Sequence, residues 1–109
     1  MVDDLRPLLA ALEAATGSDP ALDSSVARAL DAGGGAAAGD YTASVDRCLG
    51  LLATALPGWT WHVGYGAGGL FPYAALTDGR VRVVAEAPTV PLALLMAMVK
   101  ARIGEAGTG

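Results

Sequence analysis

The chain has 109 residues, of which 53% are hydrophobic and 17% are charged, a composition typical of one small globular domain over residues 1–109. Its one cysteine excludes an internal disulfide, no apolar run reaches the ~20 residues that span a bilayer, and the acidic start lacks a signal peptide's positive charge. The net charge of -4 is concentrated in residues 1–46, which carry eight acids against two arginines. The sequence therefore predicts a soluble cytoplasmic protein. Its acidic front half could attract a basic protein surface, but the favoured interpretation is that these acids solvate helix faces and cap helix starts.

Residues 3–31 predict an N-terminal helical hairpin. Four leucines, at positions 5, 8, 9 and 12, repeat at helical spacing, and Gly17 can end this first helix. Asp19 is placed to cap a second helix, because Pro20 suits a first helical turn. Residues 32–40 then form a Gly/Ala linker, which is no phosphate loop because no "GK[ST]" follows it.

Two further helices bracket a core over residues 41–104. The first, over 42–56, has an apolar stripe with Cys48 beside it, and Pro57 and Gly58 end it. The second begins near Pro91 and is apolar nearly all round, which is typical of a buried helix. Its methionines are therefore expected to fill the core rather than line a groove for a partner.

Between these helices, three strands are expected over 59–65, 70–77 and 80–87. Asp78 and Gly79 predict a two-residue type I′ turn that pairs Thr77 with Arg80, and a second turn is centred on residues 67–68. Both turns place the same side chains on one apolar face. That face comprises Trp59, Trp61, Val63, Tyr65, Leu70, Pro72, Ala74, Leu76, Val81, Val83 and Ala85, and both tryptophans are expected to point into the core.

The reverse face of this sheet is mixed. It is expected either to form a contact surface or to lie partly under the N-terminal helix pair. Its members are Thr60, His62, Phe71, Tyr73, Ala75, Thr77, Arg80, Arg82, Val84 and Glu86. The fold class is thus α+β, a three-stranded antiparallel meander in the order α-α-α-β-β-β-α.

Several chemistries are excluded by context. Residues 64–69 match G-x-G-x-x-G, but a strand pattern follows instead of the helix that a dinucleotide's pyrophosphate requires. His62 is the only imidazole, which excludes a paired-histidine metal site, and Cys48 has no evident activating neighbour. We therefore expect no catalytic residue, no metal and no cofactor.

Nucleic-acid binding is a weaker alternative. The order helix, three antiparallel strands, helix is also that of double-stranded RNA binding domains, which contact phosphates through basic residues at the start of the last helix. Here that position reads "PTVPLALL", without a lysine or arginine. The alternative then depends on Arg80 and Arg82.

Four segments taken in order carry a resemblance. They are "LEAATGSDPALD" from Leu12, "YTASVDRCLGLL" from Tyr41, "PGWTWHV" from Pro57 and "APTVPLALLMAMVKAR" from Ala87. As an ordered set they resemble the phage ABA-sandwich domain family, small proteins encoded in phages and prophages. The resemblance implies an α/β/α sandwich with helices on both faces of the sheet, and a bacterial cell as the setting. The Gly/Ala run at 33–39 and Pro91 depart from the family pattern.

The expected function is that of a non-catalytic phage or prophage protein that binds a host protein, for example as an inhibitor of a CRISPR-type defence complex. A structural or assembly accessory of the phage particle, as a homo-oligomer, is the alternative. Two groups of candidate partner-binding residues follow, an acidic one and one on the reverse face of the sheet. They are Asp19, Asp23 and Asp31, and His62, Phe71, Tyr73, Arg80 and Arg82.

Overall fold

The fold follows the predicted order of elements. The computed structural model describes residues 5–30, 41–65 and 71–108, so the linker at 32–40 and the turn at 67–68 lie outside the described residues. The elements are α1 (Arg6–Ala14), α2 (Pro20–Leu30), a short 3-10 helix η1 (Tyr41–Ala43), α3 (Val45–Ala55), β1 (Thr60–Tyr65), β2 (Pro72–Thr77), β3 (Arg82–Glu86) and α4 (Val90–Thr108). This confirms the α+β class and the three-stranded antiparallel sheet.

Each of the three longer helices begins where a side-chain oxygen accepts a backbone N–H of its first turn. Oδ1 of Asp19 accepts the N–H of Ala21 at 2.9 Å, which confirms the predicted cap of α2. The hydroxyl of Ser44 accepts the N–H of Arg47 at 3.2 Å at the start of α3. The hydroxyl of Thr89 caps α4 in the same way. Because Ser44 is the cap of α3, that helix starts at Val45, three residues later than the predicted position 42.

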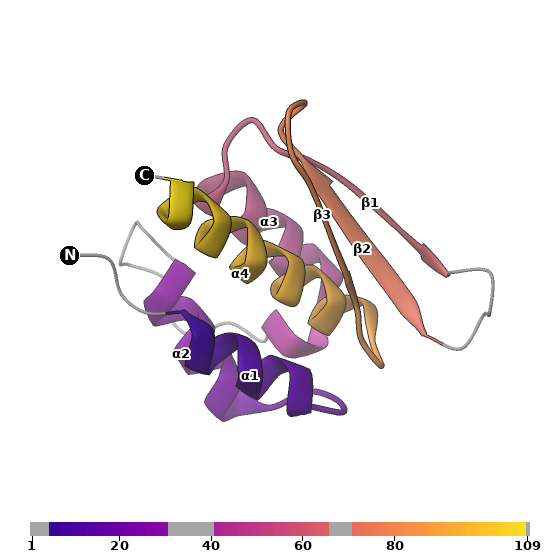
Figure 1. The fold of residues 1–109 in the computed structure, drawn as a ribbon. Helices are drawn as coiled ribbons and strands as arrows, with labels where there is room; N and C mark the ends of the chain where they lie inside the picture. Colours follow the sequence, from indigo (N-terminus) through magenta and orange to yellow (C-terminus); the bar gives the residue numbers. More distant parts are fainter. Residues whose placement is uncertain (1–4, 31–40, 66–70, 109) are drawn as a thin grey trace.

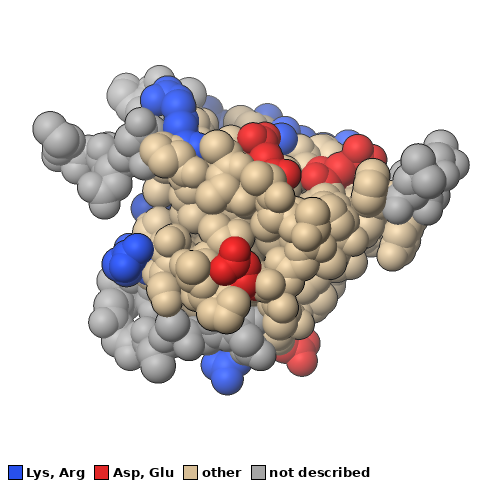
Figure 2. All heavy atoms as spheres, turned by 90° about the horizontal axis from the view of Figure 1, so that it is seen from below, with Lys and Arg blue, Asp and Glu red and all other residues tan. Residues whose placement is uncertain are grey.

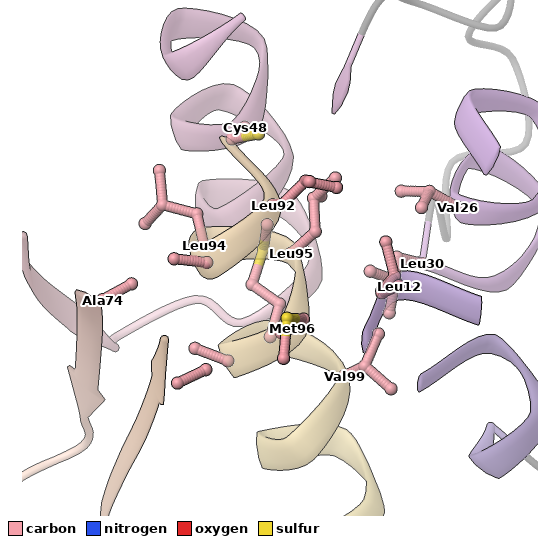
Figure 3. Close-up of a cluster of buried hydrophobic side chains, with 14 of the residues drawn as sticks. Leu12, Val26, Leu30, Cys48, Ala74, Leu92, Leu94, Leu95, Met96 and Val99 are labelled. Atoms are coloured by element: carbon pink, nitrogen blue, oxygen red, sulfur yellow. The ribbon is translucent and has the colours of Figure 1, made fainter. Parts of the chain in front are cut away.

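Helix α4 is the centre of the core. Every residue from 92 to 99 is buried, the two methionines included, which confirms the prediction of a helix that is apolar on all sides. Figure 3 shows why both sides of α4 need apolar residues. Leu94 lies on the side that faces Ala74 of β2, and Val99 lies on the side that faces Leu12 of α1. Because α4 separates the sheet from the α1–α2 pair, one helix supplies most of the apolar contact for both.

The strands pair in a register shifted by two residues from the prediction. Trp61 lies opposite Leu76, not Ala74, and Thr77 pairs with Arg82, not Arg80. A shift of two keeps the side chains of the three observed strands on their predicted faces, because side chains alternate with a period of two; Arg80 and Val81 lie in the loop instead, and Leu70 lies outside the described residues. The predicted separation into two faces is therefore confirmed, although the pairing is wrong.

The β2–β3 connection explains the shift. The carboxylate of Asp78 accepts the N–H groups of Arg80 and Val81 at 2.8 and 2.9 Å, so residues 78–81 form a four-residue loop. Gly79 has φ +93°, a conformation that glycine adopts without steric cost. The two-residue type I′ turn is wrong because the side chain of Asp78 stabilises a longer loop.

All described helices lie on one side of the sheet, as Figure 1 shows. Helix α4 crosses β2 and β3, α3 packs on α4, and α1 and α2 lie beyond α4. The α/β/α sandwich implied by the resemblance, with helices on both faces, is therefore not what the described residues form. The physical reason is that α1 and α2 bury their leucines against the apolar rear of α4, whereas the second face of the sheet carries Arg82 and Glu86.

Candidate functional site

One face of the sheet is left without a covering helix, and we call it the open face. Along each strand its residues alternate with those of the covered face, where Ala74, Leu76 and Ala85 are buried, so the side chains of the open face point away from α4. It comprises Thr60, His62, Tyr73, Ala75, Thr77, Arg82, Val84 and Glu86, together with Phe71, which continues the alternation directly before β2. The reverse face predicted from the sequence is thus a surface, and the alternative of a cover by the N-terminal helices is excluded by their position.

An ordered aromatic group lies on the open face. The rings of His62 and Tyr73 have centroids 5.7 Å apart at an angle of 41°. The Tyr73 ring extends over Gly64 on the neighbouring strand, where an added Cβ would lie 3.5 Å from it. This is an ordinary van der Waals distance, so the Tyr73 ring lies against the β1 backbone at Gly64.

Exposed apolar side chains extend this aromatic group. Phe71 is 49% exposed and Val84 is 45% exposed, although both are large hydrophobic residues. Isolated exposed hydrophobic residues are common, but two on one uncovered sheet face, beside the partly exposed ring of Tyr73, indicate a binding surface. The open face therefore combines Phe71, Tyr73 and Val84 in a way that burial in the chain's own core does not explain.

Charged groups flank the apolar centre. Arg82 and Glu86 are exposed on β3, and Arg80 is exposed in the adjoining hairpin loop. Nζ of Lys100 in α4 reaches around the edge of the sheet and donates to the carbonyl oxygen of Val84 at 3.3 Å. An open depression of about 570 Å³ lies at this edge, lined by Tyr73, Arg82, Val84, Ala85, Glu86 and Lys100. The apolar centre therefore has a polar rim on the β3 side.

The acidic candidates lie elsewhere and have structural partners. Asp23 is only 7% exposed, and its Oδ1 accepts both the backbone N–H and the hydroxyl of Thr42 at 2.7 Å. The backbone N–H of Asp19 donates to the same hydroxyl at 2.8 Å, while its carboxylate caps α2. Both residues therefore fasten α2 to η1, and Asp31 lies outside the described residues. On the face that Figure 2 shows, the acidic groups form no continuous patch, because uncharged or basic atoms separate them.

The structure thus brings His62, Tyr73 and Arg82 together on the open face, with Phe71 directly before β2 and Arg80 in the adjoining loop. It does not bring the aspartates to them. Thr42, which joins the two aspartates, was missed by sequence reasoning because nothing in its immediate neighbours marks a threonine for burial.

Cys48 and His62 do not lie together. Cys48 is fully buried beneath the helices, where its Sγ donates to the carbonyl oxygen of Tyr41 at 3.1 Å. His62 is exposed on the opposite side of the sheet. Within the described part of the chain, no three His, Cys, Asp or Glu side chains gather as metal ligands would, and no helix could cross a membrane.

Strand β1 differs from the prediction in one respect that concerns binding. Trp61 and Tyr65 lie on the helix-facing side as predicted, but they are 48% and 64% exposed. The prediction that Trp61 is a core residue is wrong, because α4 covers β2 and β3 and leaves β1 beyond its reach. Trp59 and Val63 are partly buried against the core.

Comparison with known proteins supplies no identity. No family model, no curated protein and no solved structure matches the chain.

Proposed function

We propose that this chain is a non-catalytic binding protein that contacts another protein through the open face of its sheet. The observation that carries the proposal is the uncovered face itself, with Phe71, Tyr73 and Val84 turned away from the core. A sheet normally buries its more apolar face, and here the second face also keeps exposed aromatic and branched side chains.

The composition of the open face favours a protein as the partner. Protein interfaces combine an apolar, aromatic centre with a polar rim, and tyrosine and arginine are enriched among residues that contribute most to affinity. Tyr73 lies near the centre and Arg82 at the rim, which matches that arrangement. Because the sheet already orders the backbone that carries these side chains, the conformational entropy lost on binding is mainly that of the side-chain rotamers.

The resemblance to the phage ABA-sandwich domain family supplies the biological part of the proposal. A phage or prophage protein acts inside a bacterial cell, so the proposed partner is a host protein or protein complex. The specific version is inhibition of a host defence complex of the CRISPR type. This version is motivated by the small size of the chain.

A capture experiment tests the proposal. The tagged chain is incubated with lysate from a bacterial host, and the captured proteins are identified and quantified by mass spectrometry. We expect one host protein or complex in stoichiometric amount. Capture is expected to fall at least tenfold in Phe71→Ala and in Val84→Lys, because truncating a central interface residue costs about 1–2 kcal/mol or more.

The matched control places a lysine at Ala53, which is exposed on α3. Ala53→Lys should capture the partner as well as the parent chain does. A partner whose recovery is equal in Val84→Lys and in Ala53→Lys would contradict the open face as the binding surface. The lack of any stoichiometric partner would contradict the proposal as a whole.

Nucleic-acid binding is a second candidate because Arg80 and Arg82 are both exposed near the open face. It predicts retardation of RNA or DNA that weakens as salt rises and is lost when both arginines are changed to alanine. No retardation at low salt would remove this candidate.

A further inference from the structure

The outer edge of β1 is unprotected. Strand order β1-β2-β3 makes β1 an edge strand, and among the described elements only β2 packs against it at any length. In Figure 1 the outer side of β1 faces away from all the helices. An edge strand presents backbone N–H and C=O groups that another strand can bond.

The printed hydrogen bonds fix which groups point outward. The N–H of Ala87 donates to the carbonyl of Pro72, so Pro72, Ala74 and Leu76 direct their backbone groups toward β3. The alternate residues of β2 bond β1, and their partners there are Thr60, His62 and Gly64. The backbone groups of Trp61, Val63 and Tyr65 therefore point away from the sheet, and no described residue bonds them.

The opposite edge of the same sheet is protected. On β3 the outward carbonyl of Val84 already accepts a hydrogen bond from Nζ of Lys100. Arg82 and Glu86 flank it with charges on the open face. Charged side chains on edge strands prevent pairing with other chains. By contrast, the sequence of β1, TWHVGY, has no Lys, Arg, Asp, Glu or Pro.

We infer that a second copy of this chain pairs with β1, antiparallel about a two-fold axis through Val63, to form a continuous six-stranded sheet. Antiparallel pairing about such an axis matches the three outward residues with one another, because residues equidistant from Val63 face each other. Trp61 then lies opposite the partner subunit's Tyr65, and Val63 lies opposite the partner subunit's Val63. Each of these pairs can exchange both backbone hydrogen bonds.

The side chains also favour a second copy over another partner. Trp61 and Tyr65 are exposed on the same side of β1, so the two-fold register places a tryptophan against a tyrosine twice. Aromatic cross-strand pairs are among the stabilising pairs of antiparallel sheets. On the open face His62 meets the partner subunit's Gly64, so no like charges are opposed. The edge is thus complementary to itself.

This inference extends the proposed function without depending on it. Pairing through β1 would align two open faces in one sheet, so that a dimer presents the proposed binding surface twice. The two proposals are measured separately, because dimer formation is detected as a change in the mass of the purified chain and partner binding as the amount of host protein captured. Failure of one leaves the other measurable.

The test is the mass of the purified chain by sedimentation equilibrium. A strand-pair interface is smaller than about 1,200 Å², so the dimer should form at about 10–500 μM. The double variant Trp61→Lys with Tyr65→Lys opposes lysines at both outer pairs and should remain monomeric over this range. The variant with glutamate at both positions should also be monomeric. An equimolar mixture of the lysine and glutamate chains should regain the mass of a dimer, because each lysine then faces a glutamate.

Val84→Lys is the matched control, since it places a lysine on the other edge strand at an apolar residue of similar exposure. It should dimerise like the parent chain. Circular dichroism of each variant confirms that it is folded. A parent chain that stays monomeric at 500 μM, about the upper end of this range, would overturn the inference. It would be overturned equally by a double-lysine variant that still dimerises, or by a lysine–glutamate mixture that fails to.

Discussion

Helix α2 and the open face of the sheet distribute polar and apolar side chains in opposite ways. On α2 the ionisable Asp23 is buried and bonded to Thr42, while on the sheet the apolar Phe71 and Val84 are exposed. Hydrophobic burial alone would predict the reverse. The difference shows that Asp19 and Asp23 act within the fold, whereas the open face presents exposed aromatic and aliphatic side chains. Variants on both regions test this contrast.

The largest effect is expected at Asp23. Asp23→Ala leaves the buried N–H and hydroxyl of Thr42 without their acceptor, and hydrogen bonds to a charged group are worth about 2–3 kcal/mol. We expect the free energy of unfolding in urea to fall by that amount. Glu13→Ala, at an exposed acid of α1, should change it by less than about 0.5 kcal/mol. Equal losses in the two variants would contradict a structural role for Asp23.

A smaller loss is expected at Asp19. Asp19→Ala removes the oxygen that caps α2, and such caps contribute about 1 kcal/mol. Asp19→Asn should keep most of this stability, because its side-chain oxygen can still accept the N–H of Ala21. Thermal unfolding followed by circular dichroism measures both. A loss in Asp19→Asn as large as that in Asp19→Ala would show that charge, not capping, is what matters.

On the open face, removal of an apolar side chain should barely change stability. Val84→Ala exposes no core and is expected to change the free energy of unfolding by less than about 0.5 kcal/mol. Leu76→Ala, on the covered face of the neighbouring strand, should lower it by about 2–4 kcal/mol. Urea unfolding of this pair compares the two faces directly. A large loss in Val84→Ala would show that the open face serves the fold and not a partner.

The smallest effect on stability is expected at Asp78, in the hairpin loop that borders the open face. The N–H groups of Val81 and Arg80 hold the pKa of Asp78 below its ordinary value. A lowered pKa means that the folded state favours the charged carboxylate, so this contribution is present above the unfolded pKa of about 3.9 and is lost as the pH falls below it. Asp78→Asn should therefore lose less stability than the parent chain between about pH 5 and pH 3. Identical acid profiles in urea would contradict this.

The sequence predicts the elements and their faces because these depend on local signals. Asp19 before Pro20 indicates where α2 begins, and alternation along the strands separates Trp61 from His62 whatever the register. The unbroken apolar run of α4 predicts its burial in the same way.

What the sequence could not predict depends on how the elements pack. The exposure of Trp61 follows from α4 crossing β2 and β3 but not β1, and no local pattern encodes that position. The burial of Asp23 follows from the approach of η1, which lies 19 residues further along the chain. The sequence left open whether the α1–α2 pair covers the second face of the sheet. The pair could pack on that face or on α4, and it packs on α4, which is the more apolar of the two.

The central place of α4 has a consequence for the order in which the chain folds. Of the described elements it is the last to leave the ribosome, and both the α1–α2 pair and the sheet bury their apolar sides against it. Until it emerges, the leucines of α1 and the covered face of β2 lack their main packing partner. Folding therefore waits for the end of synthesis of residues 90–103, and the nascent chain exposes apolar surface that chaperones can bind until then.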